Sequence, residues 1–435
     1  MKSVVFSIRS KGLRKYLTRG QSILKRYGLT PSKMMQALDQ LSRVLRDFEC
    51  GATFPITAVT VRRNSEAAEM LRKYVDQGIE FAIHGYRHVD HSQLTLEEQV
   101  VELRRAREVF AAAGIPVAGF RSPYLRFNES LRTAAGEIGL AYVSNQSILW
   151  DVLDGKTFPS AAQAAYIRAL ALYTPWSAEE WPSVPYLQDG MVEIPVSLPD
   201  DEMLLDRLGG DDTGLVERAW SRILGETYRR GELFTLQLHP ERAVLCASAL
   251  SALLAKARSL DPPAWVARME EIASWWRALS EASVTVTGAG DGKLCLSVAG
   301  PERATLLIRN LEVDGPAHSW IQGYQRCATK TLVVRTDIRP FVGVSPGISP
   351  EWLRFLQQQG YIVEISDDLQ GYSIYLNRHD FVAGNRRAPL IKIEESDDPL
   401  VKLGRWPDGA RSALAVTGDI DALTVWDYGL RYLGH

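Results

Sequence analysis

The sequence predicts an α/β fold built on a mostly parallel sheet, joined to a smaller module of mixed strands and helices. Apolar runs of strand length alternate with amphipathic helical segments between residues 30 and 280, which is the pattern of repeated βα units. The sheet of such a chain is either open or closed into a barrel. The chain has 435 residues. A domain with a single hydrophobic core is usually shorter than this, so a second module is expected.

The helices of the first part are marked by their caps and by their apolar spacing. Thr30 and Pro31 stand as an N-cap residue and a proline at the first helical position. Apolar side chains then recur every three or four residues over 34–48, so one face of this helix lies on a core. Thr95-Leu-Glu-Glu98 is a capping box, which predicts another helix up to about Gly114. Further helices are predicted at 64–78 and 265–279, and strands at 52–58, 80–83, 119–120, 192–196 and 233–238.

A β-rich stretch begins near residue 283. Alternating runs at 283–287 and 293–298 flank a Gly-Ala-Gly-Asp-Gly turn, which predicts a β-hairpin. Residues 412–417 show the pattern of a buried strand. We therefore expect a main body at 1–282, an additional α/β module at 283–400, and a returning strand of the main body within 401–435. Inside the module, strands are predicted at 305–308, 331–335, 341–344 and 361–365, and a helix at 350–359.

Composition and charge exclude several classes of protein. The hydrophobic fraction is 46% and the charged fraction 23%, which is typical of a globular chain and not of a disordered or fibrous one. A net charge of −2 offers no basic excess for a nucleic-acid partner. The four cysteines lie far apart with no CxxC pair, so neither a zinc knuckle nor a disulfide scaffold is indicated.

The N-terminal segment indicates whether the protein is expected to be secreted or to contact a membrane. No run of about 18 apolar residues is present, and the apolar stretch near the N-terminus is too short for a signal peptide. We therefore expect a cytoplasmic protein without a membrane span. Residues 9–26 combine seven Lys and Arg residues with apolar residues at helical spacing. This segment is predicted to be either a helix packed on the body or a helix in peripheral contact with a membrane.

Three histidines fall within eight residues directly after a predicted strand. His84, His88 and His91 follow the apolar run at 80–83. Functional side chains gather at such strand ends, because the loops at the carboxyl edge of a parallel sheet face a shared crevice. His84 and His88 are four residues apart and can reach one divalent ion. A polar surface loop with exposed histidines explains the same pattern, so both interpretations stay open.

Other polar residues also follow predicted strands. Asp419 and Asp421 point to the same side of the chain, so one can bind a metal while the other acts as a general base. Aspartates are also common as loop caps after strands, and taken alone the pattern favours this explanation. His239 follows the strand at 233–238 and either protonates a leaving group or is a buried, hydrogen-bonded histidine. Arg121 ends the strand at 119–120 and would otherwise be a solvated residue of a turn.

The residues around these sites, and the order of the sites along the chain, resemble the sequence motifs of one family. Phe81-Ala-Ile-His84-Gly-Tyr-Arg-His88, Arg121-Ser-Pro-Tyr124 and Leu236-Gln-Leu-His239-Pro240 resemble the second, third and fifth motifs of the polysaccharide deacetylase family, the NodB-homology carbohydrate esterases. Ala52-Thr-Phe-Pro-Ile-Thr-Ala58 is similar to the Ala-Thr-Phe-Phe strand of that family. The resemblance covers about residues 30–280 and the last 25 residues. It implies that the parallel sheet is a distorted (β/α) barrel.

The first motif departs from the family order. In the family, Thr-Phe-Asp-Asp-Gly precedes the Ala-Thr-Phe-Phe strand, where this chain has no such acidic pair. The nearest equivalent is Thr417-Gly-Asp419-Ile-Asp421, which suggests a circular permutation that delivers the first barrel strand last. The Asp-x-Asp spacing resembles the branch that deformylates lipid-linked aminoarabinose. The fourth motif of the family has no clear match in this chain. Either Trp150-Asp151 or Ser144-Asn145 occupies its place.

The resemblance implies a metal-dependent hydrolase that removes an acetyl group from an N-acetylated amino sugar. His84, His88 and Asp421 are implied to hold Zn²⁺, with Co²⁺, Ni²⁺ or Mn²⁺ as alternatives. Asp419 is implied to be the base, although the unusual spacing leaves open which aspartate is base and which is ligand.

The remaining roles follow from the same resemblance. His239 is implied to protonate the departing amine, and Arg121 to orient Asp419 through a bidentate pair. Tyr124, through its backbone N–H, and Trp150 are implied to contact the carbohydrate. Two alternatives stay open: a deformylase or deacylase acting on a lipid-linked amino sugar, which the basic N-terminus fits, and a catalytically inactive glycan-binding homologue.

Overall fold

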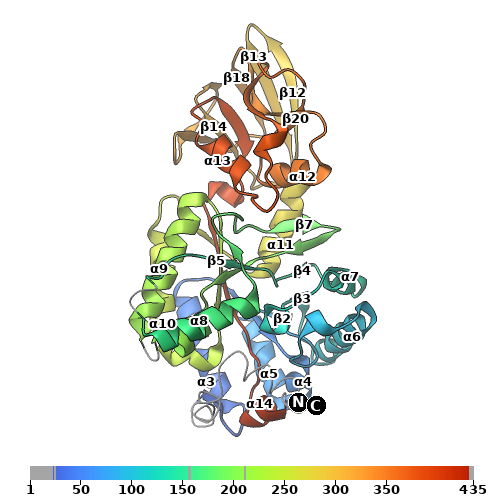
Figure 1. The fold of residues 1–435 in the computed structure, drawn as a ribbon, viewed down its shortest axis with the longest axis vertical. Helices are drawn as coiled ribbons and strands as arrows, with labels where there is room; N and C mark the ends of the chain where they lie inside the picture. The colour runs from blue at the N-terminus through green and yellow to red at the C-terminus, as the bar shows by residue number, and fades with distance from the viewer. Residues whose placement is uncertain (1–22, 24–25, 155–157, 210–211, 431–435) are drawn as a thin grey trace.

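The computed structural model describes residues 23, 26–154, 158–209 and 212–430, and its main sheet is mostly parallel (Figure 1). Within these residues the main sheet has nine strands, in the order β10-β23-β1-β2-β3-β4-β8-β7 and with β11 beside β23. The strands are β1 (Ala52–Ile56), β2 (Ile79–Ile83), β3 (Val117–Phe120), β4 (Tyr142–Val143), β7 (Tyr186–Gln188), β8 (Met191–Glu193), β10 (Leu233–Leu238), β11 (Trp265–Val266) and β23 (Ala413–Gly418).

A second sheet extends the main sheet toward a closed ring. It consists of β6 (Trp176–Ser177), β5 (Ser147–Leu149) and β9 (Val196–Leu198). The backbone N–H of Val196 donates to the carbonyl of Gln146, so β5 and β9 continue the pairing of β4 and β8. On its other side β9 packs against β10, the strand at the far end of the main sheet. The fold is therefore the distorted (β/α) barrel that the resemblance implied.

Helices cover the outer face of the barrel. Phe54, Leu236 and Val416 point from the strands into a core that the helices share. The capping box predicted at Thr95 is confirmed, because its hydroxyl accepts from the N–H of Glu98 while the Glu98 carboxylate accepts from the N–H of Thr95. The helices outside the strands are α3 (Ser32–Asp47), α4 (Ala58–Arg63), α5 (Ser65–Val75), α6 (Leu96–Ala112), α7 (Ser130–Glu137), α8 (Ser160–Tyr173), α9 (Thr213–Arg230), α10 (Ala243–Ser259) and α14 (Val425–Leu430), with the π-helical η4 (Glu202–Gly209) and the short turns η1 (His91–Gln93), η2 (Pro123–Leu125) and η5 (Pro240–Arg242).

One helix lies on the inner face of the strands. α11 (Met269–Ser280) packs Ile272 and Trp276 against Ala82 and Ala415, whose small side chains leave room for it. The expectation of a helix from residue 265 onward is wrong at its start. Trp265 and Val266 instead pair with β23 as β11, and the helix begins at Met269.

The C-terminal strand β23 lies in the middle of the main sheet. It pairs in parallel with β10 along its whole length and with β1 at Thr53 and Thr417. An isolated parallel bridge between Ile56 and Ile420 continues the pairing beyond the strand end. The carboxyl end of β23 therefore lies beside the carboxyl ends of β1 and β10, although the chain reaches it last.

Residues 283–403 fold into three small sheets beyond one end of the barrel (Figure 1). The predicted hairpin is present as β12 and β13, and β22 pairs with β14, so the chain returns to the barrel only after Leu403. The elements are β12 (Ser283–Gly290), β13 (Lys293–Ala299), β18 (Thr331–Arg335) and β15 (Glu312–Asp314) in one sheet, β16 (His318–Ser319), β17 (Tyr324–Cys327), β14 (Leu306–Arg309) and β22 (Leu400–Leu403) in the second, and β20 (Val363–Ile365), β19 (Arg339–Val344) and β21 (Tyr372–Leu376) in the third, with α12 (Pro350–Gln358), α13 (Ala388–Glu394) and η6 (Arg378–Asp380). The short turn η7 (Pro407–Gly409) follows on the way back to the barrel.

These sheets are attached at the amino ends of the barrel strands. The guanidinium of Arg387 donates to the buried carboxylate of Glu232 at 2.6 and 3.1 Å. The indole N–H of Trp406 donates to the carbonyl of Gly231 at 3.0 Å. Gly231 and Glu232 directly precede β10. The attachment therefore lies at the opposite end of β10 from His239.

Two expectations about membranes have different outcomes. Among the helices that the structure describes, none combines the length and the apolar character needed to cross a bilayer. Most of the basic N-terminal segment, residues 9–22 and 24–25, lies outside the described residues. The helix expected there stays a prediction.

Candidate metal and catalytic site

The predicted residues follow the ends of four strands and lie at one edge of the barrel. His84 follows β2, Arg121 follows β3, His239 follows β10 and Asp419 follows β23. In the order of the sheet these strands are neighbours, with only β1 between β23 and β2. Because parallel strands end at the same edge, residues from the first fifth and the last part of the chain meet in one site.

His84, His88 and Asp421 form a group of three metal-binding side chains. The Nε2 atoms of His84 and His88 lie 3.5 and 3.2 Å from Oδ1 of Asp421, and the three ligand atoms lie within 4.8 Å of one another. Three ligands held tetrahedrally at ~2.0–2.1 Å from one Zn²⁺ ion stand about 3.3 Å apart. The two histidine–aspartate separations match this spacing, so the group fits such an ion.

A hydrogen bond orients His84 toward this group. Its Nδ1 lies 2.9 Å from the carbonyl oxygen of Arg121. Because a carbonyl oxygen can only accept, Nδ1 carries a proton, and in the neutral form of the ring Nε2, which faces Asp421, has the lone pair. A carbonyl partner behind the ring is the usual arrangement around a metal-binding histidine, where it fixes the tautomer and the ring plane.

Tyr124 packs against the second histidine. Its ring meets that of His88 edge to face, with the centroids 4.4 Å apart. The backbone of Tyr124 is left-handed, with φ at 62°, in the short η2 turn after β3. Non-glycine residues seldom adopt this conformation, and those that do concentrate at functional sites. Its implied role toward substrate is consistent with this position next to His88.

Asp419 is held by two donors on either side. Its Oδ1 accepts from Nη1 of Arg121 at 3.0 Å and its Oδ2 accepts from the side-chain amide of Gln237 at 2.9 Å. The expected bidentate pair with Arg121 is wrong, because Nη2 of this buried guanidinium donates instead to Ser144 at 3.0 Å. Nη1 also donates to Thr417 at 2.7 Å. Each oxygen of Asp419 retains capacity to accept a proton.

His239 forms a buried pair with Asp201. Its Nδ1 lies 2.7 Å from Oδ1 of Asp201, and its backbone N–H donates to Oδ2 at 2.9 Å. Burial disfavours the charged imidazolium, but the carboxylate of Asp201 outweighs burial and raises the pKa of His239 well above its ordinary value. Asp201 therefore favours the charged form of the ring, in which Nε2 also carries a proton.

Asp200 makes this second cluster a further group of potential metal ligands. Asp200, Asp201 and His239 offer ligand atoms within 4.8 Å of one another. Burial, followed by the charge of Asp201, raises the pKa of Asp200 to about 7. Both oxygens of Asp201 already face His239, one its ring Nδ1 and the other its backbone N–H. The contacts therefore favour a proton-holding pair at Asp201.

His91 stands apart from the other two histidines. It is completely buried, and its ring lies 5.0 Å from that of Phe120. Burial, together with the nearby imidazoles of His84 and His88, lowers the pKa of His91 to about 3. The third histidine of the motif is thus a neutral packing residue in the described structure.

Sequence reasoning missed Asp201 and Gln237. Asp201 follows β9 through Pro199 and Asp200, so an acidic pair just after an apolar strand was the available signal. Gln237 precedes His239 by two residues in an extended segment, which puts both side chains on one side. Neither pattern identifies the contact that the side chain makes, because His239 is distant from Asp201 in the sequence and Asp419 is distant from Gln237.

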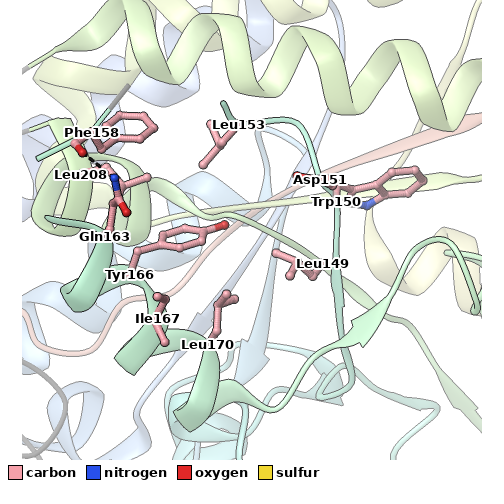
Figure 2. Close-up of a pocket in the computed structure, with 10 residues that line it drawn as sticks. All are labelled: Leu149, Trp150, Asp151, Leu153, Phe158, Gln163, Tyr166, Ile167, Leu170 and Leu208. Atoms are coloured by element: carbon pink, nitrogen blue, oxygen red, sulfur yellow. Dashed lines mark hydrogen bonds between the residues drawn. The ribbon is translucent and has the colours of Figure 1, made fainter. Parts of the chain in front are cut away.

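The residues considered for the fourth motif have other tasks. Ser144 accepts from Arg121, and the side-chain oxygen of Asn145 accepts from the backbone N–H of Ser122 at 2.8 Å. Trp150 is buried and, with Asp151, lines an apolar pocket (Figure 2). The carboxylate that holds His239 comes from Asp201 instead.

Comparison with protein families supports the recognition made from the motifs. Residues 28–143 match the family model described as polysaccharide deacetylase. The match contains His84, His88 and Arg121 and so confirms the predicted family over this part of the chain. His239 and the two aspartates after β23 lie outside the matched range. No curated protein matches the chain.

Several solved structures are similar to parts of the chain. One is from Mycobacterium smegmatis and is assigned as a polysaccharide deacetylase; it shares 23% identity and a TM-score of 0.42 over 59% of this chain and 82% of its own. Another from Pseudomonas aeruginosa PAO1, with the same assignment, shares 19% identity and a TM-score of 0.42 over 55% and 73%. A family 4 carbohydrate esterase pseudoenzyme from Bacillus anthracis shares 16% identity and a TM-score of 0.30 over 55% and 61%.

Proposed function

We propose that the chain is a metal-dependent hydrolase that removes the N-acetyl group from an N-acetylated amino sugar. One observation carries the proposal: a three-ligand group of His84, His88 and Asp421 stands beside Asp419 and on the same barrel edge as the His239–Asp201 pair. Hydrolysis of an amide needs a base for water, an electrophile for the carbonyl and an acid for the amine.

His84, His88 and Asp421 would hold the metal. A bound divalent ion polarises the amide carbonyl and makes a water easier to deprotonate at neutral pH. Two imidazole nitrogens and one carboxylate oxygen suit Zn²⁺, and the same donors also accept Co²⁺, Ni²⁺ or Mn²⁺. The hydrogen bond from His84 to the Arg121 carbonyl supports this assignment, because it leaves the second nitrogen of the ring ready to bind.

Asp419 would take the proton from the attacking water. Arg121 and Gln237 each donate to one of its oxygens, so the carboxylate plane is fixed while lone pairs stay available. Arg121 is itself held by Thr417 and Ser144, which limits its movement. Asp421 is the ligand in this assignment, because it and not Asp419 lies within reach of both histidines.

His239 would give a proton to the departing amine. An amide nitrogen leaves poorly as an anion, so the donor must be charged before the bond breaks. Asp201 supplies that condition by raising the pKa of His239. The left-handed Tyr124 next to His88 would offer its backbone N–H to the carbonyl oxygen. Trp150 is buried, so the contact with carbohydrate that the resemblance implied for it is not part of this proposal.

The position of β23 supports the interpretation as a circular permutation. A strand reached last in the chain pairs with β1 and β10 and carries the two aspartates. In this interpretation the insertion of residues 283–403 at the amino ends of the strands leaves the catalytic edge unchanged.

The test combines metal analysis with product analysis. The purified chain should bind one divalent ion and release acetate from N-acetylated amino sugars, and His84→Ala should lose both. Metal binding without release of acetate or formate from a panel of amino sugars would favour the inactive glycan-binding homologue. Absence of stoichiometric metal in the wild type would contradict the proposal.

A further inference from the structure

The last turn of α8 is tied to the strand-end loops of the barrel. Nη1 of Arg126 donates to the carbonyl of Leu172 at 3.2 Å, and the hydroxyl of Ser147 donates to the carbonyl of Tyr173 at 3.3 Å. The last carbonyls of a helix have no partner within the helix, so these two donors supply one. Arg126 belongs to the loop after β3, and Ser147 begins β5. The position of Tyr173, the last residue of α8, is therefore fixed from both of these elements.

The side chain of Tyr173 packs on a small apolar cluster that includes Leu125 and Met203. Leu125 belongs to the η2 turn, which touches the metal-binding group through the ring contact of Tyr124. Met203 belongs to η4 and follows the acidic run that contains Asp201, the partner of the proposed proton donor. The ring of Tyr173 therefore lies where the segments that carry the two halves of the candidate site come together.

The hydroxyl of Tyr173 donates to a carboxylate. It lies 3.4 Å from Oε2 of Glu202, whose Oε1 is 3.2 Å from Nη2 of Arg207. Since a carboxylate only accepts, the hydroxyl is the donor in this contact. Desolvation, followed by the charges of Glu202 and Asp200, raises the pKa of Tyr173 well above its ordinary value. Asp421, the proposed metal ligand, adds to this rise and Arg207 opposes it. The hydroxyl therefore keeps its proton and lies within the electrostatic reach of both halves of the site.

A hydroxyl that donates in one direction can accept in another. The phenol oxygen of Tyr173 keeps lone pairs when its proton points at Glu202, and the side chain is half-buried, so part of it can touch a substrate. In the proposed function the amide bridges the metal-binding group and His239, so the ring that carries the amide lies beside Tyr173. We propose that Tyr173, held by Glu202, binds a ring hydroxyl of the amino sugar and so selects a sugar over other acetamides. This inference rests on the proposed function for the placement of the substrate.

The test deletes sugar hydroxyls one at a time. The best substrate among the methyl glycosides of N-acetylated glucosamine, galactosamine and mannosamine is compared with its 3-deoxy, 4-deoxy and 6-deoxy derivatives. In the wild type one deletion should lower kcat/KM by about five- to tenfold, the worth of one hydrogen bond. Tyr173→Phe should lose as much on the parent glycoside, and the same deletion should then cost less than about twofold, because two changes that remove one contact are not additive. Deletions that cost the same in both proteins, or no costly deletion in the wild type, would overturn the proposal.

Tyr228→Phe is the matched control. Tyr228 is a half-buried tyrosine near the end of α9, and its hydroxyl donates to the carbonyl of Pro262 at 2.9 Å. It lies shortly before β10, at the opposite end of that strand from His239. The control should keep the wild-type kcat/KM for the parent and for every deoxy derivative, and both variants should keep the wild-type metal content. The same loss of discrimination in Tyr228→Phe would contradict the assignment to Tyr173.

Calorimetry on the same glycosides separates failure of the sugar contact from failure of the proposed function. The wild type should bind the parent glycoside more tightly than its weakest deoxy derivative, and Tyr173→Phe should bind the two alike, whether or not acetate is released. This pattern without acetate release would reject the proposed hydrolysis and keep the sugar contact. Acetate release with equal deoxy losses in both proteins would keep the hydrolysis and reject the contact. Neither binding nor acetate release with any of the glycosides would reject both.

Discussion

The metal-binding half and the proton-donating half of the candidate site are built in opposite ways. His84, His88 and Asp421 direct ligand atoms at one point, and the carboxylate is partly exposed, so an ion can enter. His239 and Asp201 are buried and direct Nδ1 and Oδ1 at each other, so these two atoms share a proton instead of pointing at a common centre. In the proposed function, the same residue types, histidine and aspartate, therefore take different roles according to whether their atoms point at a shared centre or at each other.

The largest effect is expected on the metal-binding half. His84→Ala should lose bound metal and fall to background activity, because two ligands hold an ion far more weakly than three. Elemental analysis and acetate release on the same preparation measure both. His379→Ala is the matched control, since His379 is an exposed histidine of the η6 turn remote from the barrel edge. If His84→Ala kept stoichiometric metal, this histidine would not be a ligand.

Asp419 and Asp421 should respond differently to the same small change. Asp419→Asn removes the base but no ligand, so metal stays bound and kcat drops by ~10²–10⁴-fold. Asp421→Asn should release the metal instead. Metal content and kcat of the two variants side by side decide the roles, and exchanged phenotypes would mean that Asp419 is the ligand and Asp421 the base.

His239→Ala should separate amide from ester substrates. An amine needs protonation before it leaves, whereas the nitrophenolate of an activated ester does not. The rate on the amide should therefore fall by about 10²-fold or more, with a much smaller loss on nitrophenyl acetate and unchanged metal content. Equal losses on both substrates would show that His239 shapes the site and that the proton comes from elsewhere.

Asp201→Asn should change the pH dependence more than the maximal rate. Asp201 raises the pKa of His239, so its removal lowers that pKa and His239 loses its proton at a lower pH. The alkaline limb of kcat against pH should move to lower pH in the variant, with activity recovered as the medium becomes more acidic. An alkaline limb that stays in place would show that it reports another group.

The smallest effect is expected at Gln237. Gln237→Ala removes one hydrogen bond to Asp419 but leaves Arg121 in place, so kcat should fall by about tenfold, the low end for such supporting contacts. KM and metal content should stay near the wild-type values. A loss as large as that of Asp419→Asn would mean that Gln237 contacts the reacting groups itself.

The sequence indicated all three residues of the proposed metal-binding half but only His239 of the proposed proton-donating half. His84 and His88 are visible because both ligands lie in one short motif after an apolar strand. Asp419 and Asp421 were candidates from their spacing, but only the family resemblance selected Asp421 as the ligand that joins these histidines. Its position beside them depends on β23 pairing between β10 and β1. Such pairing is a long-range property that no local pattern encodes.

Asp201 was missed for the same physical reason. Its contact with His239 depends on β9 packing beside β10, and β9 is only three residues long. The apolar pocket was also beyond reach, because its lining comes from three segments that are ordinary apolar sequence when taken singly. The predicted start of α11 was wrong, because Trp265 and Val266 are compatible both with a helix and with the short strand that pairs with β23.

The most direct test of the central claim is a crystal structure of the metal-loaded chain with diffraction recorded at the absorption edge of zinc. The account predicts one anomalous peak at ~2.0–2.2 Å from Nε2 of His84, Nε2 of His88 and Oδ1 of Asp421. A peak at Asp200, Asp201 and His239, or a metal bound by the histidines without Asp421, would contradict it.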